Sequence, residues 1–99
     1  MHSPTAEQIL EFAAQLEGMR LTTNARKTPF SLAVLADGIE FTPASSGKPR
    51  PLLTHDIQRI CDEYCRTKSV QPKDYQGITF NASYVLTLIE MYQNENKSD

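Results

Sequence analysis

The dipeptide Asp37-Gly38 lies between two segments in which apolar and polar residues alternate, and this arrangement is typical of a β-hairpin. With Asp37 and Gly38 as a two-residue type I′ loop, Val34 faces Phe41 across the hairpin. One face then carries only apolar residues: Phe30, Leu32, Val34, Ala36, Ile39, Phe41 and Pro43. The other face carries Ser31, Ala33, Leu35, Glu40 and Thr42. Because a one-residue change of register would mix the two faces, the sequence predicts strands over 28–36 and 39–43 with one buried side.

Helices are expected on both sides of this hairpin. The first begins at Pro4 after the N-cap Ser3 and stops near Gly18, with an apolar stripe of Ile9, Phe12, Ala13, Leu16 and Met19. The second follows the cap Thr54, and its expected buried side is Ile57, Ile60, Cys61, Tyr64, Cys65 and Val70. The third runs from the cap Asn81 to about Gln93. A short helical turn begun by Pro72 is expected between the second and third helices.

The remaining segments complete the expected architecture. Residues 51–53 read as a third, edge strand because of Pro51, and residues 21–23 as a short strand or an irregular segment. We therefore predict an α+β fold: an N-terminal helix, a three-stranded antiparallel sheet with its hairpin turn at Asp37-Gly38, and two C-terminal helices. The length of 99 residues fits one domain over 1–93, with 94–99 as a polar, frayed tail.

Charge is unevenly distributed along the chain. The formal net charge is only −2, which by itself argues against a nucleic-acid binder. The first 19 residues carry three glutamates and no Lys or Arg, whereas residues 20–50 carry five cations against Asp37 and Glu40. No apolar run is long enough to span a membrane, and no secretory signal is recognisable, so a cytoplasmic location is expected.

The loop over 42–50 is the main candidate for ligand binding. Ser46-Gly47-Lys48 invites comparison with a nucleotide-binding P-loop, but Thr42 and Pro49 stand where that motif needs Gly and Ser or Thr. A weaker anion site remains: backbone N–H groups of a polar loop with nearby cations can hold one phosphate of a nucleic acid. Its candidate residues are Arg26, Lys27, Ser45, Ser46, Gly47, Lys48, Arg50 and Asn81. The alternative is a solvated loop whose Ser and Gly satisfy their own backbone.

Catalysis and metal binding find little support in the sequence. Cys61 and Cys65 are four residues apart on a helix, but a tetrahedral site needs two more ligands, so both are expected in the core. On a continuous helix His55 and Cys61 point to different sides, which disfavours a nucleophile–base pair. We therefore expect no catalytic residues, no metal and no cofactor.

The third helix offers a candidate interaction surface. Its apolar residues cover about half of its circumference, which suggests either a deeply buried helix or one shared with a partner. The interaction candidates are Tyr84, Leu88, Met91 and Tyr92. Tyr75, in the turn before this helix, is the tyrosine expected to be exposed.

Several short patterns resemble a group of short, uncharacterised bacterial proteins of the kind found on mobile elements, including integron gene cassettes. The patterns are Pro29-Phe30, the segment from Thr42 to Arg50, Pro72-Lys73-Asp74-Tyr75 and the segment from Thr79 to Val85. The resemblance spans about Leu21 to Tyr92. It implies a cytoplasmic bacterial protein with a compact fold, and it transfers no catalytic residue.

Two functions follow as hypotheses. The first is a non-enzymatic interaction module that binds a protein partner or a second copy of itself, through the 81–93 helix or a sheet edge. The second is a nucleic-acid or phosphate-backbone binding protein that uses the basic segments 26–27 and 45–50. The positions of these residues in the folded protein distinguish the two hypotheses. Four cations gathered near the start of the third helix favour nucleic-acid binding, whereas an exposed apolar face favours a protein partner.

Overall fold

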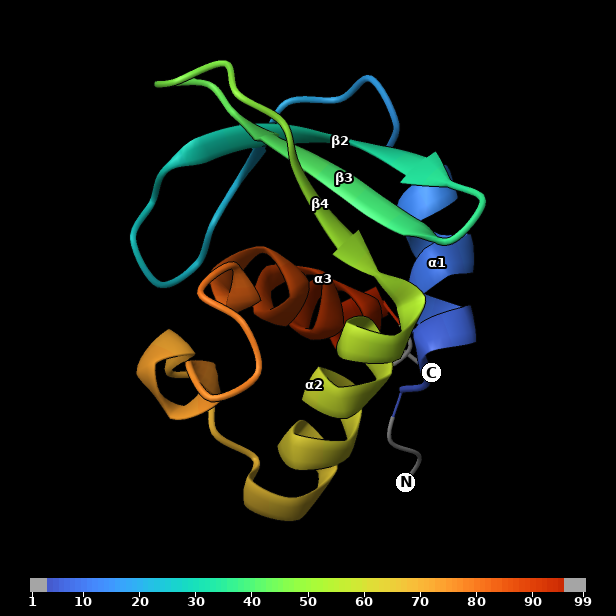
Figure 1. Cartoon of the computed structure of the whole chain (residues 1–99), viewed down its shortest axis with the longest axis vertical. Helices are drawn as coiled ribbons and strands as arrows, with labels where there is room; N and C mark the ends of the chain where they lie inside the picture. Colours follow the sequence, from blue (N-terminus) through green and yellow to red (C-terminus); the bar gives the residue numbers. More distant parts are fainter. Residues whose placement is uncertain (1–3, 96–99) are drawn as a thin grey trace.

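The computed structural model describes residues 4–95, which form two layers (Figure 1). A four-stranded antiparallel sheet packs one face against three α-helices. The elements are α1 (Ala6–Ala14), β1 (Leu21–Thr22), β2 (Pro29–Leu35), β3 (Gly38–Pro43), β4 (Arg50–Leu53), α2 (Thr54–Thr67), the 3₁₀ helix η1 (Pro72–Tyr75) and α3 (Ala82–Glu95). The predicted α+β class is confirmed. The sheet has four strands instead of three, because residues 21–22 pair with β2.

The strands follow one another in the sheet in chain order, β1-β2-β3-β4, and each pair is antiparallel. The buried face predicted for the hairpin is confirmed: Phe30, Leu32, Ile39 and Phe41 are all less than 5% exposed. The predicted register is wrong, since Val34 lies opposite Ile39 and not Phe41. The displacement is two residues, and because side chains alternate with a period of two, the residues paired in the ladder keep their predicted faces. Ala36, predicted on the apolar face, instead lies in the turn and is exposed.

The turn of this hairpin also differs from the prediction. Ala36 and Asp37 form the two-residue loop, with Leu35 opposite Gly38 as the last ladder pair. Neither loop residue has a positive φ, so the turn is not type I′. Gly38 is instead needed for close contact with β4, because a Cβ atom on it would lie 2.1 Å from the carbonyl oxygen of Leu52. The glycine therefore reflects strand packing, and not turn conformation.

The N-terminal helix begins two residues later than expected, at Ala6 instead of Pro4. Its N-cap is Thr5, which exchanges hydrogen bonds with Gln8 in a capping box, and Pro4 precedes the cap. The predicted cap Ser3 lies outside the described residues. The stripe is confirmed at Ile9, Phe12, Ala13 and Leu16, but Met19 is 50% exposed because α1 ends at Ala14.

The second helix follows β4 with no loop between them. Thr54 is the first residue of α2 and not its cap, and its N–H donates to the carbonyl of Asp37. Ile57, Ile60, Cys61 and Tyr64 are buried as predicted, whereas Cys65 and Val70 are exposed. Lys68 ends the helix in the left-handed conformation, at φ 59°, so Val70 lies beyond the helix and outside its apolar stripe.

The third helix is the most enclosed element of the fold. Five consecutive residues of α3, from Val85 to Ile89, are at most 2% exposed, so the helix is covered on all sides in its middle. Thr87 is satisfied there because its hydroxyl donates to the Ser83 carbonyl and accepts the N–H of Asn24. The helix extends to Glu95, so residues 94–95 are helical and do not belong to a frayed tail; residues 96–99 lie outside the described range.

Candidate functional site

The two basic segments lie at the same end of the sheet. Pairing of Phe30 with Pro43, together with a 3.0 Å hydrogen bond from Ala44 N–H to the Pro29 carbonyl, joins the start of β2 to the end of β3. The β1–β2 connection, with Arg26 and Lys27, and the β3–β4 connection, with Lys48, therefore emerge at this end, on the left in Figure 1. We call this region the basic end; it also includes Arg50, the first residue of β4.

The cations of the basic end have no acidic partners. Arg26, Lys27, Lys48 and Arg50 are all exposed, and within residues 4–95 none of them forms an ion pair. The arginines of α2 differ, because Arg59 pairs with Asp56 and Arg66 with Glu63. Unpaired, solvated cations are the groups that can exchange small counterions for phosphates.

The β3–β4 connection satisfies part of its own backbone. Gly47 has φ 69° and donates its N–H to the Pro43 carbonyl at 2.8 Å, and the Ser46 hydroxyl accepts the N–H of Lys48. Ser45, Ser46 and Gly47 are exposed. The N–H groups of Gly47 and Lys48 are therefore occupied within the loop, as expected for a loop that satisfies its own backbone. The cations are the main groups that this segment offers to a ligand.

The start of α3 lies under the basic end. The Tyr84 ring, in the first turn of α3, stacks on Phe41 at a centroid distance of 5.1 Å and meets Phe30 edge-on at 5.0 Å. Phe41 is directly opposite Arg50 in the β3–β4 ladder, so Arg50 starts on the face of the sheet that α3 covers. Asn81, half-buried, accepts the N–H of Tyr84 through its carbonyl, and its side chain forms no hydrogen bond with the described residues.

Sequence reasoning missed Phe80, which immediately precedes this helix. It is 83% exposed, more than any other large apolar side chain in the described part of the chain. A residue in its position, just before the cap, ordinarily packs on the fourth helical residue as a hydrophobic staple. That residue, Val85, is wholly inside the core, and Phe80 remains in solvent. No signal in the sequence indicates this exposure.

The predicted interaction residues of α3 do not form one accessible surface. Leu88 is 0% exposed, so it cannot contact a partner. Met91 and Tyr92 pack against the core, where the Tyr92 ring meets Phe12 edge-on at 5.6 Å. Tyr84 is half-buried between sheet and helix. The apolar arc of α3 is therefore occupied by the fold itself.

The sheet edges are poorly suited to strand pairing with another chain. The β4 edge carries Pro51, which has no N–H, and β1 at the other edge has only two residues. Beyond β1, where the edge of β2 is open, the carboxylate of Glu17 accepts the Val34 N–H at 2.6 Å. These features disfavour binding of a partner by strand addition at either edge of the sheet.

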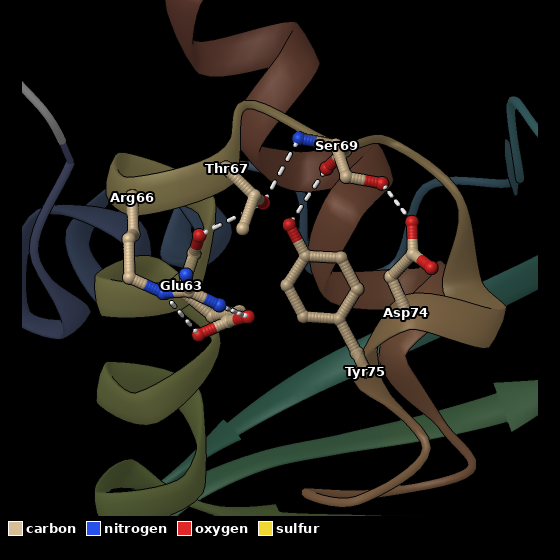
Figure 2. A network of polar contacts seen from close by, with 6 residues as sticks. All are labelled: Glu63, Arg66, Thr67, Ser69, Asp74 and Tyr75. Atoms are coloured by element: carbon tan, nitrogen blue, oxygen red, sulfur yellow. Dashed lines mark hydrogen bonds and ion pairs between the residues drawn. The ribbon is translucent and has the colours of Figure 1, made fainter.

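The connection from α2 to η1 is held by a polar network (Figure 2). The Tyr75 hydroxyl donates to the Ser69 carbonyl at 2.6 Å, and the Ser69 hydroxyl donates to Asp74. Thr67 receives the Ser69 N–H and donates to the Glu63 carbonyl. The Tyr75 ring is 0% exposed, so the prediction that Tyr75 is exposed is wrong. Burial raises the pKa of its phenol.

An open groove of about 500 Å³ lies beside this network. It is lined by Arg59, Asp62, Glu63, Arg66, Asp74, Gly77 and Ile78. Both of its arginines are paired with carboxylates. Arg66 donates two hydrogen bonds from its guanidinium group to Glu63, and Arg59 forms an ion pair with Asp56. Within residues 4–95 no cluster of His, Cys, Asp and Glu could hold a metal ion. The groove therefore supplies neither a free cation nor a metal site.

The two cysteines differ sharply in environment, and this gives a testable result. Burial, aided by the neighbouring charge of Asp62, raises the pKa of the Cys61 thiol from 9.0 to about 12, whereas Cys65 is exposed. We expect a thiol reagent at pH 8 to modify Cys65 in the folded protein and to reach Cys61 only after unfolding, because the thiolate is the nucleophile. Thiol counting with and without denaturant measures this; two fast thiols in the folded protein would contradict it.

The pKa of Cys61 also sets a direction for stability against pH. Above pH 9 the unfolded chain releases the Cys61 proton while the folded protein retains it up to about pH 12. The free energy of unfolding is therefore expected to fall as pH rises through this window. Tyr64 and Tyr75, whose pKa values burial also raises above 10.0, act in the same direction.

Comparison with protein-family models, with curated protein sequences and with solved structures returns no match. None of the helices described over residues 4–95 is long and apolar enough to cross a membrane.

Proposed function

We propose that this protein is a small, non-enzymatic domain that binds the phosphate backbone of a nucleic acid through its basic end. The observation that carries the proposal is the gathering of Arg26, Lys27, Lys48 and Arg50 at one end of the sheet, all exposed and none paired with a carboxylate. The start of α3 beneath them adds the unbonded side chain of Asn81. The proposal needs no cofactor, metal or catalytic residue.

The distribution of charge explains how a chain of net charge −2 can bind a polyanion. A local field at a few ångströms depends on neighbouring groups, because salt screens charges beyond about 8–10 Å. The glutamates of residues 1–19 lie on α1 and the turn after it, whereas the basic end is made by the β1–β2 and β3–β4 connections. A phosphate approaching the basic end therefore encounters four cations that form no ion pair within residues 4–95. One carboxylate lies at this end, since Glu90 accepts a hydrogen bond from the Asn24 side chain of the β1–β2 connection.

Affinity for a fluorescently labelled single-stranded oligonucleotide is expected to fall steeply with salt. With four phosphate contacts, the dissociation constant should rise about fifty-fold between about 50 and 200 mM salt. The double variant Lys48→Ala and Arg50→Ala should lower the magnitude of the salt slope by roughly 1.5. Fluorescence anisotropy titrations at several salt concentrations measure both.

A control variant removes the same charge from a different place. Arg59→Ala with Arg66→Ala also deletes two cations, but these are already paired with carboxylates on α2. Its salt slope should match that of the parent protein. Equal losses in the two double variants would mean that only net charge matters, and binding that is absent or insensitive to salt would overturn the proposal.

A protein-interaction function remains a second candidate because of one observation. Leu35 and Leu53, 38% and 51% exposed, flank Gly38 in the sheet ladder on the face that no helix covers. An apolar contact there would persist at high salt, so the same salt series separates the two candidates. A bacterial, cytoplasmic and mobile-element origin stays a prediction from the resemblance described above.

A further inference from the structure

The exposure of Phe80 is the least expected feature of the surface. Burying a phenylalanine side chain is favourable, and a residue at this position has a standard partner one turn into the helix. Phe80 is nevertheless 83% exposed, while Val85 is 0% exposed. A large aromatic ring left in solvent can stack on a ligand with an apolar, planar surface.

The location of Phe80 connects it to the basic end. One turn later in the chain, Tyr84 stacks on Phe41, and Phe41 lies directly opposite Arg50 in the sheet ladder. Figure 1 shows the segment that enters α3 at the left, below the end of the sheet that carries the β1–β2 and β3–β4 connections. The segment that contains Phe80 and the two connections that carry the cations thus lie on the same side of this view.

We infer that the ligand is a single-stranded nucleic acid and that Phe80 stacks on one of its unpaired bases while the basic end holds the neighbouring phosphates. Proteins that bind single strands without strict sequence preference combine cations along the backbone with aromatic rings on the bases. Bases in an intact duplex are stacked on one another and do not offer their faces to such a ring. This inference rests on the proposed function and specifies which form of nucleic acid the basic end serves.

A tryptophan at position 80 provides a direct readout, because the chain contains no other tryptophan. In the Phe80→Trp variant the fluorescence comes from one indole at an exposed site. We expect it to be quenched by oligothymidylate of about 12 nucleotides and not by an abasic strand of equal length and charge. Phe80→Ala should weaken binding of oligothymidylate roughly 5- to 100-fold and leave binding of the abasic strand unchanged.

Leu53→Ala is the matched control, since it removes a 51% exposed apolar side chain at the other end of β4 and should bind like the parent protein. Equal affinity for thymidylate and abasic strands, with no quenching and no effect of Phe80→Ala, would overturn the stacking inference and leave phosphate binding intact. Tighter binding to a duplex than to the single strand would overturn the inference as well. Absence of binding to every oligonucleotide at low salt would overturn both proposals.

Discussion

Replacing Gly38 with alanine is expected to destabilise the domain by about 3 kcal/mol or more. The new Cβ atom would lie 2.1 Å from the Leu52 carbonyl oxygen and 2.9 Å from the Leu53 Cα, both backbone atoms that cannot move by rotating a side chain. β4 would have to move away from β3, and because α2 begins at the next residue, the buried Ile57 would be displaced with it. Overpacking of this kind costs roughly 1–3 kcal/mol and sometimes more.

Chemical denaturation of Gly38→Ala measures the loss, and thermal unfolding should show a melting temperature lower by roughly 12–20 °C. Gly77→Ala is the control, because nothing lies within 4 Å of a Cβ at that position and its φ is not in the left-handed region. Its stability should stay within about 0.5 kcal/mol of the parent or increase slightly. If both variants unfolded at the same denaturant concentration, the close approach of β4 to Gly38 would be refuted.

Removing the Tyr75 ring is expected to cost about 3–5 kcal/mol. The side chain is 0% exposed and is the largest wholly buried one in the described residues, so Tyr75→Ala leaves a cavity that the surrounding chain can only partly fill. For a domain whose total stability is of the order of 5–15 kcal/mol, this is a substantial fraction. Urea denaturation followed by circular dichroism measures it.

Tyr75→Phe separates the ring from its hydroxyl. This variant keeps the ring and loses the hydroxyl with its 2.6 Å hydrogen bond to the Ser69 carbonyl, which is expected to cost about 1–2 kcal/mol. A similar cost for the alanine and phenylalanine variants would show that the hydrogen bond, and not ring packing, holds η1 in place. An unaffected Tyr75→Ala variant would contradict the burial itself.

Gly38 and Tyr75 also show where sequence reasoning stops. The faces of the hairpin could be predicted because side-chain alternation is a local property of strands. The register could not, because a glycine after an aspartate satisfies two requirements equally well: a positive φ in a turn, or a missing Cβ beside another strand. The second requirement depends on β4, which joins the sheet 12 residues later in the chain.

The burial of Tyr75 could not be predicted for a related reason. Proline before it and glycine after it are typical of an exposed turn, and such turns usually carry polar or solvated side chains. Its burial arises from long-range packing and from the left-handed end of α2 at Lys68, which turns the chain back so that Ser69 meets the tyrosine hydroxyl. Nothing local to residues 72–77 encodes that return.

The candidate site was predicted only in part. The cations could be found from the sequence, and their assembly at one end follows once β2, β3 and β4 are antiparallel neighbours. Phe80 could not be found, because the local pattern favours its packing as a staple. The opposite error concerns Leu88, a predicted interaction residue that is 0% exposed. A sequence shows that a helix has a wide apolar arc, but it does not show whether the rest of the fold covers that arc.

The chain-order arrangement of the strands has a consequence for how the domain assembles. Each strand pairs with the one made just before it, so the sheet requires only short loop closures, whose entropic cost is small. The contact between Phe12 and Tyr92 instead joins helices at opposite ends of the described chain, and it closes a loop that contains nearly the whole domain. The sheet is thus a local structure, whereas its apolar face is sheltered only when both terminal helices are in place.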